Sequence, residues 1–160
     1  VEHYSERFNL NFTILRFRSL YGTRANEFNW ISKLIKNALS KKIIDRNGTG
    51  DELREYINVK DAAIFTSKII SKKYYKKYLM LTGNHAVKVK DLLKIINEIF
   101  DNKLKIKIHK NRLVDHYDNT PYSYIPKPAK KISFNESTDL GQGIIEIIEE
   151  LQNKKNAKSK

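Results

Sequence analysis

Two short apolar runs, separated by about thirty residues, constrain the fold of this 160-residue chain more than any other feature. The first, Phe12–Phe17, ends in a charged loop that contains Gly22. The second begins at a lone arginine, Arg54, and ends at Asp61. A short, largely apolar run is typical of a buried parallel strand. This layout suits the binding of an anionic small molecule at the mouth of a sheet.

The rest of the chain alternates expected strands with expected helices. We expect strands at Phe12–Phe17, Lys42–Ile44, Glu55–Val59, Tyr78–Leu81 and Leu104–Ile108. We expect helices at Val1–Phe8, Glu27–Leu39, Ala62–Ile70 with Asp61 as its N-cap, Val89–Phe100 and Gly143–Leu151. Ser19–Asn26 is expected to be a loop, and Gly48 and Gly50 to form a turn. This alternation predicts an α/β fold.

The charge balance is strongly basic, since 31 lysines and arginines against 18 acidic residues give a net charge of +13. Such a charge favours anionic partners, including nucleic acid. Most of these residues are lysines spread over nearly every polar stretch, which indicates a solvated surface rather than a specific nucleic-acid site. The chain has no cysteine, which fits a cytoplasmic location, and its apolar runs are too short to span a membrane. Its four histidines lack metal-ligand spacing, so we expect no metal site.

Three motifs occur in a fixed order: T-I-L-R-F-R-S-L-Y-G at residues 13–22, G-T-G-D-E-L-R-E-Y-I-N-V-K-D at residues 48–61, and Gly83 followed by a helix. This order resembles the second half of the NAD-dependent epimerase/dehydratase family, the extended short-chain dehydrogenases, which act on nucleotide sugars. The family's motifs read T-x-L-R-x-x-N-x-Y-G-P, G-x-G-x-x-x-R-x-[FY]-x-x-V-x-D and N-x-G. The resemblance covers residues 1–100 well and residues 101–151 loosely.

The resemblance implies a fold, a function and a cofactor. The fold would be the C-terminal part of a Rossmann-type parallel sheet plus a small mixed α/β substrate-binding subdomain, over residues 1–151, followed by a disordered basic tail at 152–160. The function would be that of the nucleotide-sugar-binding half of an NAD-dependent sugar-nucleotide epimerase or dehydratase. NAD or NADP would be bound mainly by an N-terminal portion that this sequence does not contain.

Arg54 is the residue that the resemblance assigns most specifically, because the family's arginine at this position holds the diphosphate of a nucleotide sugar. A guanidinium can donate two parallel hydrogen bonds to phosphate oxygens. The alternative is a surface arginine paired with Asp51, Glu52 or Glu55. Asp61 is expected to have a structural role, as a helix cap that orders the turn after the strand.

Further substrate contacts are implied around the first motif. Ser19 stands where the family has asparagine, and its hydroxyl could still donate to a phosphate or sugar oxygen. Arg24, Asn29 and Lys33 lie in the segment that faces the nucleotide in the family, although plain exposure of these side chains explains them equally well. The serine at position 19 and the threonine at position 23, where the family has proline, leave the substrate open.

The long stretch Arg112–Lys131 contains all three prolines and several aromatic residues. A loop of this length is usually functional or disordered. Within it, the segment His116–Lys127 would close over the base or sugar, with Tyr122 stacking on the base and Lys127 meeting a phosphate. An ordered, proline-rich cover over the core is the alternative. The family's loop often supplies an arginine here, and none follows Arg112.

The family performs its chemistry with a glycine-rich dinucleotide loop and a Tyr-x-x-x-Lys pair, and we recognise neither in this chain. We therefore place no catalytic residue here and expect the isolated chain to be inactive. It would be a fragment or one half of a split enzyme, with the N-terminal half as its partner, and a homodimer through the helix containing Val1–Phe8 is plausible. The rival interpretation is a non-enzymatic basic module that binds RNA or DNA, with lysines on phosphates and tyrosines stacked on bases.

Overall fold

Parallel pairing of short strands organises the molecule. The computed structural model describes residues 1–109, 127–133 and 136–158. Its first sheet has the order β1–β5–β8 and is parallel throughout. The three strands are β1 (Thr13–Phe17), β5 (Lys77–Leu81) and β8 (Lys130–Ile132). The expected α/β fold with a parallel sheet is thereby confirmed.

Two smaller sheets complete the strand arrangement. In the second sheet, β4 pairs in parallel with β2 and antiparallel with β6. In the third, β3 and β7 form a parallel pair. The bounds are β2 (Ser19–Tyr21), β3 (Ile43–Asn47), β4 (Leu53–Asn58), β6 (Ala86–Lys88) and β7 (Lys105–His109).

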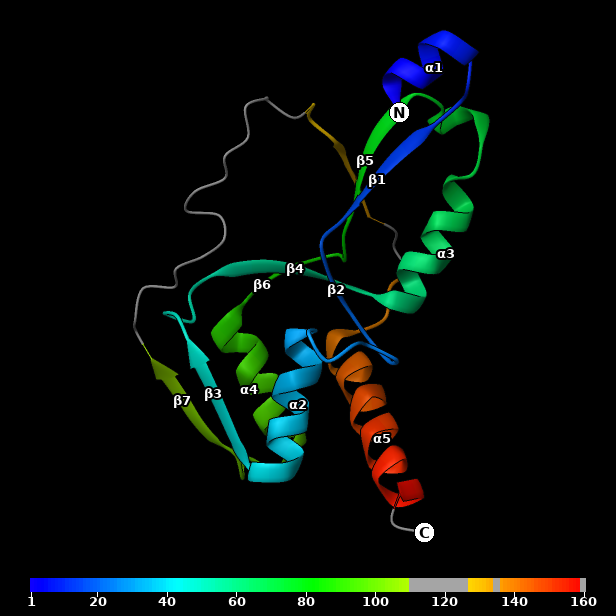
Figure 1. Cartoon of the computed structure of the whole chain (residues 1–160). Helices are drawn as coiled ribbons and strands as arrows, with labels where there is room; N and C mark the ends of the chain where they lie inside the picture. Colours follow the sequence, from blue (N-terminus) through cyan, green and yellow to red (C-terminus); the bar gives the residue numbers. More distant parts are fainter. Residues whose placement is uncertain (110–126, 134–135, 159–160) are drawn as a thin grey trace.

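The helices divide between the two ends of the molecule. They are α1 (Glu2–Phe8), α2 (Trp30–Lys41), α3 (Val59–Ile69), α4 (Val89–Ile99) and α5 (Leu140–Lys158), with a short 3-10 turn at Lys72–Tyr74. In Figure 1, α1 and α3 accompany the β1–β5–β8 sheet at the top, and α2, α4 and α5 lie with the β3–β7 pair below. Strands β2, β4 and β6 lie between these two groups.

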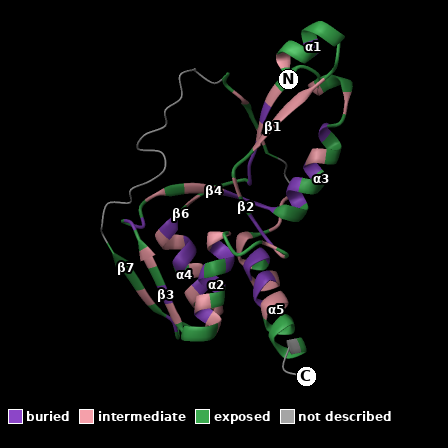
Figure 2. Ribbon diagram, in the orientation of Figure 1, coloured by how far each residue is buried: buried purple, intermediate pink, exposed green. Residues whose placement is uncertain are grey.

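Two separate hydrophobic cores result from this division. The larger core joins α2, α4, α5 and β3, and its fully buried members include Ile35, Ile44 and Ile96. The smaller core packs α3 against β5, and includes Phe65 and Leu81. Figure 2 shows buried residues along α2, α4, α5 and α3, whereas β1 carries only half-buried and exposed residues. Burial of apolar side chains is therefore far more extensive in the lower group of helices.

Asparagine caps set the start of two helices differently from our expectation. Helix α2 begins at Trp30 rather than at residue 27, because the Asn29 side chain accepts from the backbone N–H of Ser32 at 3.1 Å. Helix α3 begins at Val59, because Asn58 accepts from the N–H of Lys60 at 2.9 Å. The prediction that Asp61 caps this helix is wrong, since Asp61 lies in its first turn.

Three other expectations also needed correction. The first part of the expected loop Ser19–Asn26 is strand β2, because Ser19–Tyr21 pairs with Tyr56–Asn58 of β4. Strand β8 forms inside the expected long loop Arg112–Lys131. The disordered tail expected at 152–160 is instead helical as far as Lys158, since α5 continues through residues of good helix propensity and Lys154 pairs with Glu150 one turn earlier.

Candidate functional site

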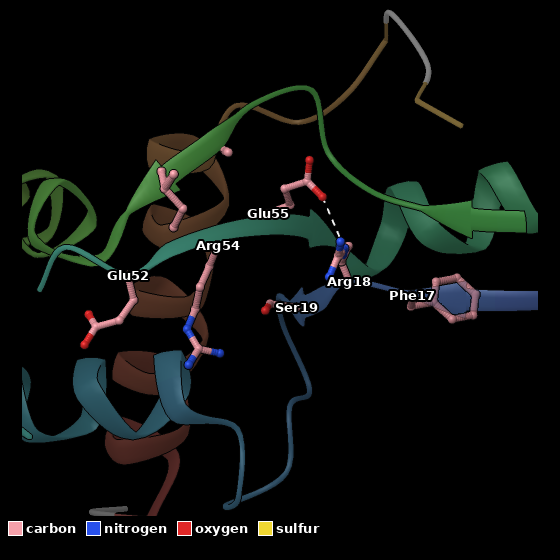
Figure 3. Close-up of a pocket in the computed structure, with 8 residues that line it drawn as sticks. Phe17, Arg18, Ser19, Glu52, Arg54 and Glu55 are labelled. Atoms are coloured by element: carbon pink, nitrogen blue, oxygen red, sulfur yellow. Dashed lines mark ion pairs between the residues drawn. The ribbon is translucent and has the colours of Figure 1, made fainter. Parts of the chain in front are cut away.

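A cavity of about 670 Å³ opens where β1 ends and the chain turns into β2. Its wall comes from the β1–β2 junction on one side and from β4 with its preceding residue on the other (Figure 3). The lining residues are Phe17, Arg18, Ser19, Glu52, Leu53, Arg54, Glu55 and Ala86. In open α/β sheets, ligands bind in the crevice beyond the carboxyl ends of the parallel strands, and this cavity lies beyond the carboxyl end of β1.

Arg54 and Ser19 lie on adjacent strands of this wall. In the parallel β2–β4 pair, Ser19 stands opposite Tyr56. Arg54 is two residues before Tyr56, so its side chain projects from the same face of the sheet as that of Ser19. Figure 3 shows the Arg54 side chain extending towards α2, with the Ser19 hydroxyl on its flank. The two residues that the sequence assigned to a phosphate group therefore share one cavity.

The guanidinium of Arg54 has no carboxylate partner among the described residues. Its Nε is buried and forms no hydrogen bond within that part of the chain. The acids that were expected to compete for it are engaged elsewhere: Asp51 with Lys90 at 2.8 Å, Glu55 with Arg18 at 3.2 Å, and Glu52 with the backbone N–H of Thr49 at 3.0 Å. The alternative of a surface arginine paired with these acids is wrong.

Glu55 connects the rim of the cavity to the first sheet. Its carboxylate forms ion pairs with the ammonium of Lys131 on β8 and with the guanidinium of Arg18. Figure 3 marks the ion pair between Glu55 and Arg18 with a dashed line. The hydrogen bond from Lys131, followed by the charges of Lys131 and Arg18, lowers the pKa of Glu55 despite its partial burial. Glu55 is therefore ionised at neutral pH and offsets one of the two positive charges, those of Lys131 and Arg18, at this side of the opening.

Glu52 provides the second negative charge of the cavity. Burial alone would raise the pKa of Glu52, but backbone N–H groups, including that of Thr49, and the charge of Arg46 outweigh burial and lower it. One carboxylate oxygen, Oε2, is buried without a hydrogen-bond partner among the described residues. Glu52 is thus an anion held in place by the turn before β4.

The other residues expected near the nucleotide lie away from this cavity. Both polar atoms of the Asn29 side chain are used locally, since Oδ1 caps α2 and Nδ2 donates to the carbonyl of Leu20 at 2.9 Å. Arg24 is exposed and lines, with Asn29, a separate cavity of about 170 Å³. Lys33 is exposed on α2. The structure does not bring these three side chains to the wall that carries Arg54.

The residues expected from the long loop are only partly described. Tyr122 lies outside the described residues. The ammonium of Lys127 contacts Glu2 of α1 at 2.6 Å and lies 5.5 Å from the centroid of the Tyr78 ring. Its carbonyl accepts from Arg16 of β1 at 2.9 Å. Lys127 therefore lies beside the first sheet and not in the wall of the Arg54 cavity, because the chain that follows it joins that sheet as β8.

Comparison with known proteins explains the order of these elements. A model of the NAD dependent epimerase/dehydratase family matches residues 1–79. Over these residues the chain is similar to that family. The matched region contains the β1–β2 junction, Arg54 and β4, which together form most of the cavity wall. A search of curated proteins gave no match.

Solved structures of epimerases and dehydratases extend the similarity beyond the matched region. An epimerase from Methanothermobacter thermautotrophicus aligns with a TM-score of 0.75 at 14% identity, covering 97% of this chain and 47% of that one. UDP-glucuronic acid 4-epimerase from Bacillus cereus aligns with a TM-score of 0.72 at 16% identity, covering 95% and 48%. An NAD-dependent NDP-hexosamine 5,6-dehydratase of tunicamycin biosynthesis aligns with a TM-score of 0.69 at 13% identity, covering 88% and 46%.

At these identities the likeness establishes the fold, and the expected Rossmann-type α/β architecture is confirmed. The chain spans about half the length of the structures it matches. Within the described ranges, none of the helices combines the length and the apolar character that are needed to cross a bilayer.

Two glycines of the epimerase/dehydratase motifs are required by the backbone around β4. Gly22 has a φ of +143°, and a Cβ at this position would lie 2.6 Å from Cγ1 of Val59. A Cβ on Gly83 would lie 2.1 Å from the carbonyl oxygen of Tyr56. Only glycine lets the chain after β2 and the chain after β5 approach the second half of β4 this closely.

The spacing Tyr-x-x-x-Lys does occur once in the chain, at Tyr56 and Lys60, and our sequence analysis overlooked it. Tyr56 lies on β4 and Lys60 in the first turn of α3, so the lysine is not one helical turn from the tyrosine. The ammonium of Lys60 instead contacts Glu146 at 3.0 Å. Burial raises the pKa of Tyr56 to about 12, although Arg54 and Arg46 oppose the increase. A tyrosine with this pKa does not supply a phenolate at neutral pH.

A second cavity, of about 370 Å³, lies between the end of β4 and the start of α5. Asp61 faces it and accepts hydrogen bonds from the N–H and hydroxyl of Thr138 at 2.7 and 2.9 Å. Tyr21 is buried there, and burial raises its pKa to about 12. Asp61 thus anchors the segment that precedes α5, which is a structural role different from the helix cap expected for it.

Arg46 is a residue near the site that sequence reasoning missed. It lies on β3, and its guanidinium stacks 4.8 Å from the centroid of the Trp30 ring. Trp30 in turn packs on Tyr56, with 6.1 Å between ring centroids. The available signal was the alternation of Ile44 and Arg46 along a strand, which places both side chains on one face. Because we expected this strand to end at Ile44, Arg46 was not recognised as a strand residue.

Proposed function

We propose that the chain is the nucleotide-sugar-binding half of an NAD-dependent sugar-nucleotide epimerase or dehydratase. The observation that carries this proposal is an arginine, Arg54, that has no carboxylate partner in the part of the chain that the structure describes and shares a cavity with Ser19 beyond the carboxyl end of β1. The match of residues 1–79 to the model of an NAD-dependent family supports it. No observation on the described residues favours the alternative of RNA or DNA binding.

The chemistry of the cavity suits a diphosphate. A guanidinium binds phosphate oxygens through two parallel, charge-assisted hydrogen bonds, and such bonds are about twice as strong as those between neutral groups. The hydroxyl of Ser19 would donate a further hydrogen bond to a phosphate or sugar oxygen. Similar solved structures include complexes of UDP-glucuronic acid 4-epimerase with UDP-glucuronic acid and of UDP-glucose 4-epimerase with UDP-glucose, so a nucleoside diphosphate sugar is the substrate class we assign.

The cofactor would be NAD or NADP, which in such enzymes removes a hydride from a sugar carbon and later returns it. This chain has no glycine-rich loop of the dinucleotide-binding type, and its Tyr-x-x-x-Lys spacing spans a strand and a helix. We therefore assign most of the cofactor contacts and the proton-transferring tyrosine to a portion outside this chain. The role of this chain is to bind and orient the nucleotide sugar.

The free side of β1 supports a partner of this kind. β1 is the edge strand of the described β1–β5–β8 sheet, and all its side chains are half-buried or exposed. On the face opposite α3, Ile14, Tyr78 and Met80 are only half-buried. A further parallel strand against β1, with a helix over that face, would complete the sheet. The N-terminal half of the same enzyme, or a separate chain equivalent to it, would supply this strand and helix. The assembled enzyme would be cytoplasmic, and α1 would be available to form a homodimer.

Binding of a nucleoside diphosphate tests the proposal directly. We expect calorimetry to detect binding of UDP or TDP to the purified chain. The Arg54→Ala variant should bind them at least tenfold more weakly, because a charged hydrogen-bonding group is lost. Arg7→Ala is the matched control, since Arg7 is exposed on α1 and stacks on Phe8. Equal affinity in the Arg54→Ala variant and the wild-type chain would reject the assignment.

Catalysis provides a second test. The chain alone should not reduce NAD in the presence of any nucleotide sugar, whereas addition of a matching N-terminal half should give epimerase or dehydratase activity. The product is identified by chromatography of the sugar nucleotide. Turnover by the purified chain without a partner would contradict the assignment of the catalytic groups to another portion.

A further inference from the structure

Arg46 is not part of the lining of the Arg54 cavity, but its charge acts on Glu52, which lines that cavity. Arg46 alternates with Ile44 on β3, and Ile44 is fully buried in the larger core. The Arg46 guanidinium stacks 4.8 Å from the centroid of the Trp30 ring, and Trp30 packs on Tyr56 of β4. Tyr56 is two residues from Arg54 on the same face of β4. The contacts of Trp30 with Arg46 and with Tyr56 therefore connect β3 to β4, the strand that carries Arg54.

Three hydrogen-bond donors of this group have no acceptor among the described residues. They are the Nε of Arg46, the Nε of Arg54 and the hydroxyl of Tyr56, and all three atoms are buried. Tyr56 as a residue is only 6% exposed. Most buried donors in proteins are paired, because an unpaired one loses its hydration without compensation. Three of them on two consecutive strands, β3 and β4, linked through the side chain of Trp30, indicate a ligand with several acceptor oxygens.

The electrostatic balance of the group is positive. Neither Arg46 nor Arg54 forms a salt bridge with a described residue. Both guanidiniums act on the Tyr56 hydroxyl, where they oppose the increase of its pKa caused by burial. The carboxylate in reach is that of Glu52, whose pKa Arg46 helps to lower. One carboxylate against two guanidiniums leaves an excess positive charge at the site.

We propose that Arg46 and Arg54 together bind one ligand with two adjacent anionic groups, each guanidinium holding one of them, while Trp30 fixes the orientation of Arg46. The Tyr56 hydroxyl would donate to an oxygen between them. This inference rests on the proposed function and makes it more specific, because it assigns a second arginine to the recognition of a diphosphate over a monophosphate. A single phosphate would bind only one of the two guanidinium groups.

The test uses the whole chain with inorganic pyrophosphate and orthophosphate, which require no recognition of a base or sugar. Binding is followed by NMR chemical-shift titration at fixed ionic strength. We expect Arg46→Gln to weaken pyrophosphate binding roughly tenfold or more, as for the loss of a charge-assisted hydrogen bond, and to change orthophosphate binding much less. Arg46→Lys, which keeps the charge but loses the planar fork, should give an intermediate loss.

Arg7→Gln is the matched control, because Arg7 also stacks on an aromatic ring, with its Cζ 5.3 Å from the centroid of Phe8, but lies outside the cavity. Thermal unfolding of each variant checks that the chain still folds. If Arg46→Gln unfolds the protein, the Arg46→Lys variant decides, since a purely structural role of the stack predicts wild-type affinity for it.

The outcomes separate this inference from the proposed function. Loss of UDP binding in Arg54→Ala, together with unchanged pyrophosphate binding in both Arg46 variants, overturns the role of Arg46 and leaves the proposed function standing. An equal loss for pyrophosphate and orthophosphate in Arg46→Gln overturns the two-anion arrangement. Failure of the wild-type chain to bind either UDP, TDP or pyrophosphate rejects both.

Discussion

The two cores of the molecule differ in how completely their own chain covers them. Around the larger core, α2, α4 and α5 enclose β3, and several side chains are fully buried, including Ile35, Leu92 and Ile144. The smaller core has α3 on one face of the β1–β5–β8 sheet, and the other face and the edge of β1 remain uncovered by described residues. Among the described residues, the larger core is therefore the more completely covered of the two, and the smaller one is covered by a helix on one face only.

Strand β4 belongs to both cores and explains where the cavity forms. Tyr56 packs into the larger core, and its neighbour Ile57 packs into the smaller one. Arg54 and Glu55, at the start of the same strand, line the cavity between the two parts. A binding residue on a strand that is fixed from both sides keeps its position, which a phosphate-binding guanidinium requires.

A large-to-small substitution should have its greatest effect in the larger core. Leu93→Ala, at a residue that is 1% exposed, should lower the free energy of unfolding by about 3 kcal/mol, because it leaves a cavity among helices that cannot collapse. Urea denaturation measures it. Ile70→Ala, at a residue that is 81% exposed, should change stability little. Similar losses for both variants would contradict the buried position of Leu93 in the larger core.

Gly83→Ala tests the packing at the junction of the two parts. The new Cβ would lie 2.1 Å from the Tyr56 carbonyl oxygen, so backbone must move and we expect a loss of about 2 kcal/mol. Gly141→Ala is the control, because the nearest atom to its Cβ is a side-chain oxygen of Asp139 at 3.1 Å. The comparison fails if both variants unfold at the wild-type midpoint.

Acid should loosen the connection between the parts by a smaller amount. The pKa of Glu55 is lowered in the folded chain by Lys131 and Arg18, so its contribution to stability is present at neutral pH and is lost as the pH falls through that lowered value. We expect acid to remove about 1 kcal/mol of the free energy of unfolding through Glu55. Denaturation at a series of pH values measures this loss, and the dependence of stability on pH should be weaker in Glu55→Gln. Glu136→Gln, at a side chain that is 91% exposed, should leave this dependence unchanged. An identical pH dependence in Glu55→Gln would remove Glu55 as a connection.

The sequence predicted the regular elements well where periodicity was strong. The runs at 12–17 and 78–81 became β1 and β5, and the helical spacing from Val89 became α4. Arg54 and Ser19 were assigned to one substrate site by the order of the family's motifs, although neither was expected to lie on a strand. These successes depend on local pattern and on the family's fixed spacing, both of which are readable from one sequence.

The errors have a common physical origin in contacts between distant segments. β2 and β8 are three residues long and form only because a neighbouring strand is present to pair with them. The start of α3 was misplaced because Asn58 and Asp61 are both good capping residues and only the path of the backbone decides between them. Arg46 was missed because its partner Trp30 lies on α2, sixteen positions earlier in the chain.

The uncovered side of β1 also determines how this polypeptide will behave when it is produced alone. On this side the backbone N–H and carbonyl groups of β1 meet no described strand, and exposed Phe17 and half-buried Ile14 lie beside them, so β1 offers a template to which another copy can add its own strand. The high net charge of +13 opposes such self-association at low ionic strength, and added salt weakens that protection. Purified material should therefore remain dispersed in dilute buffer and form aggregates as salt is raised.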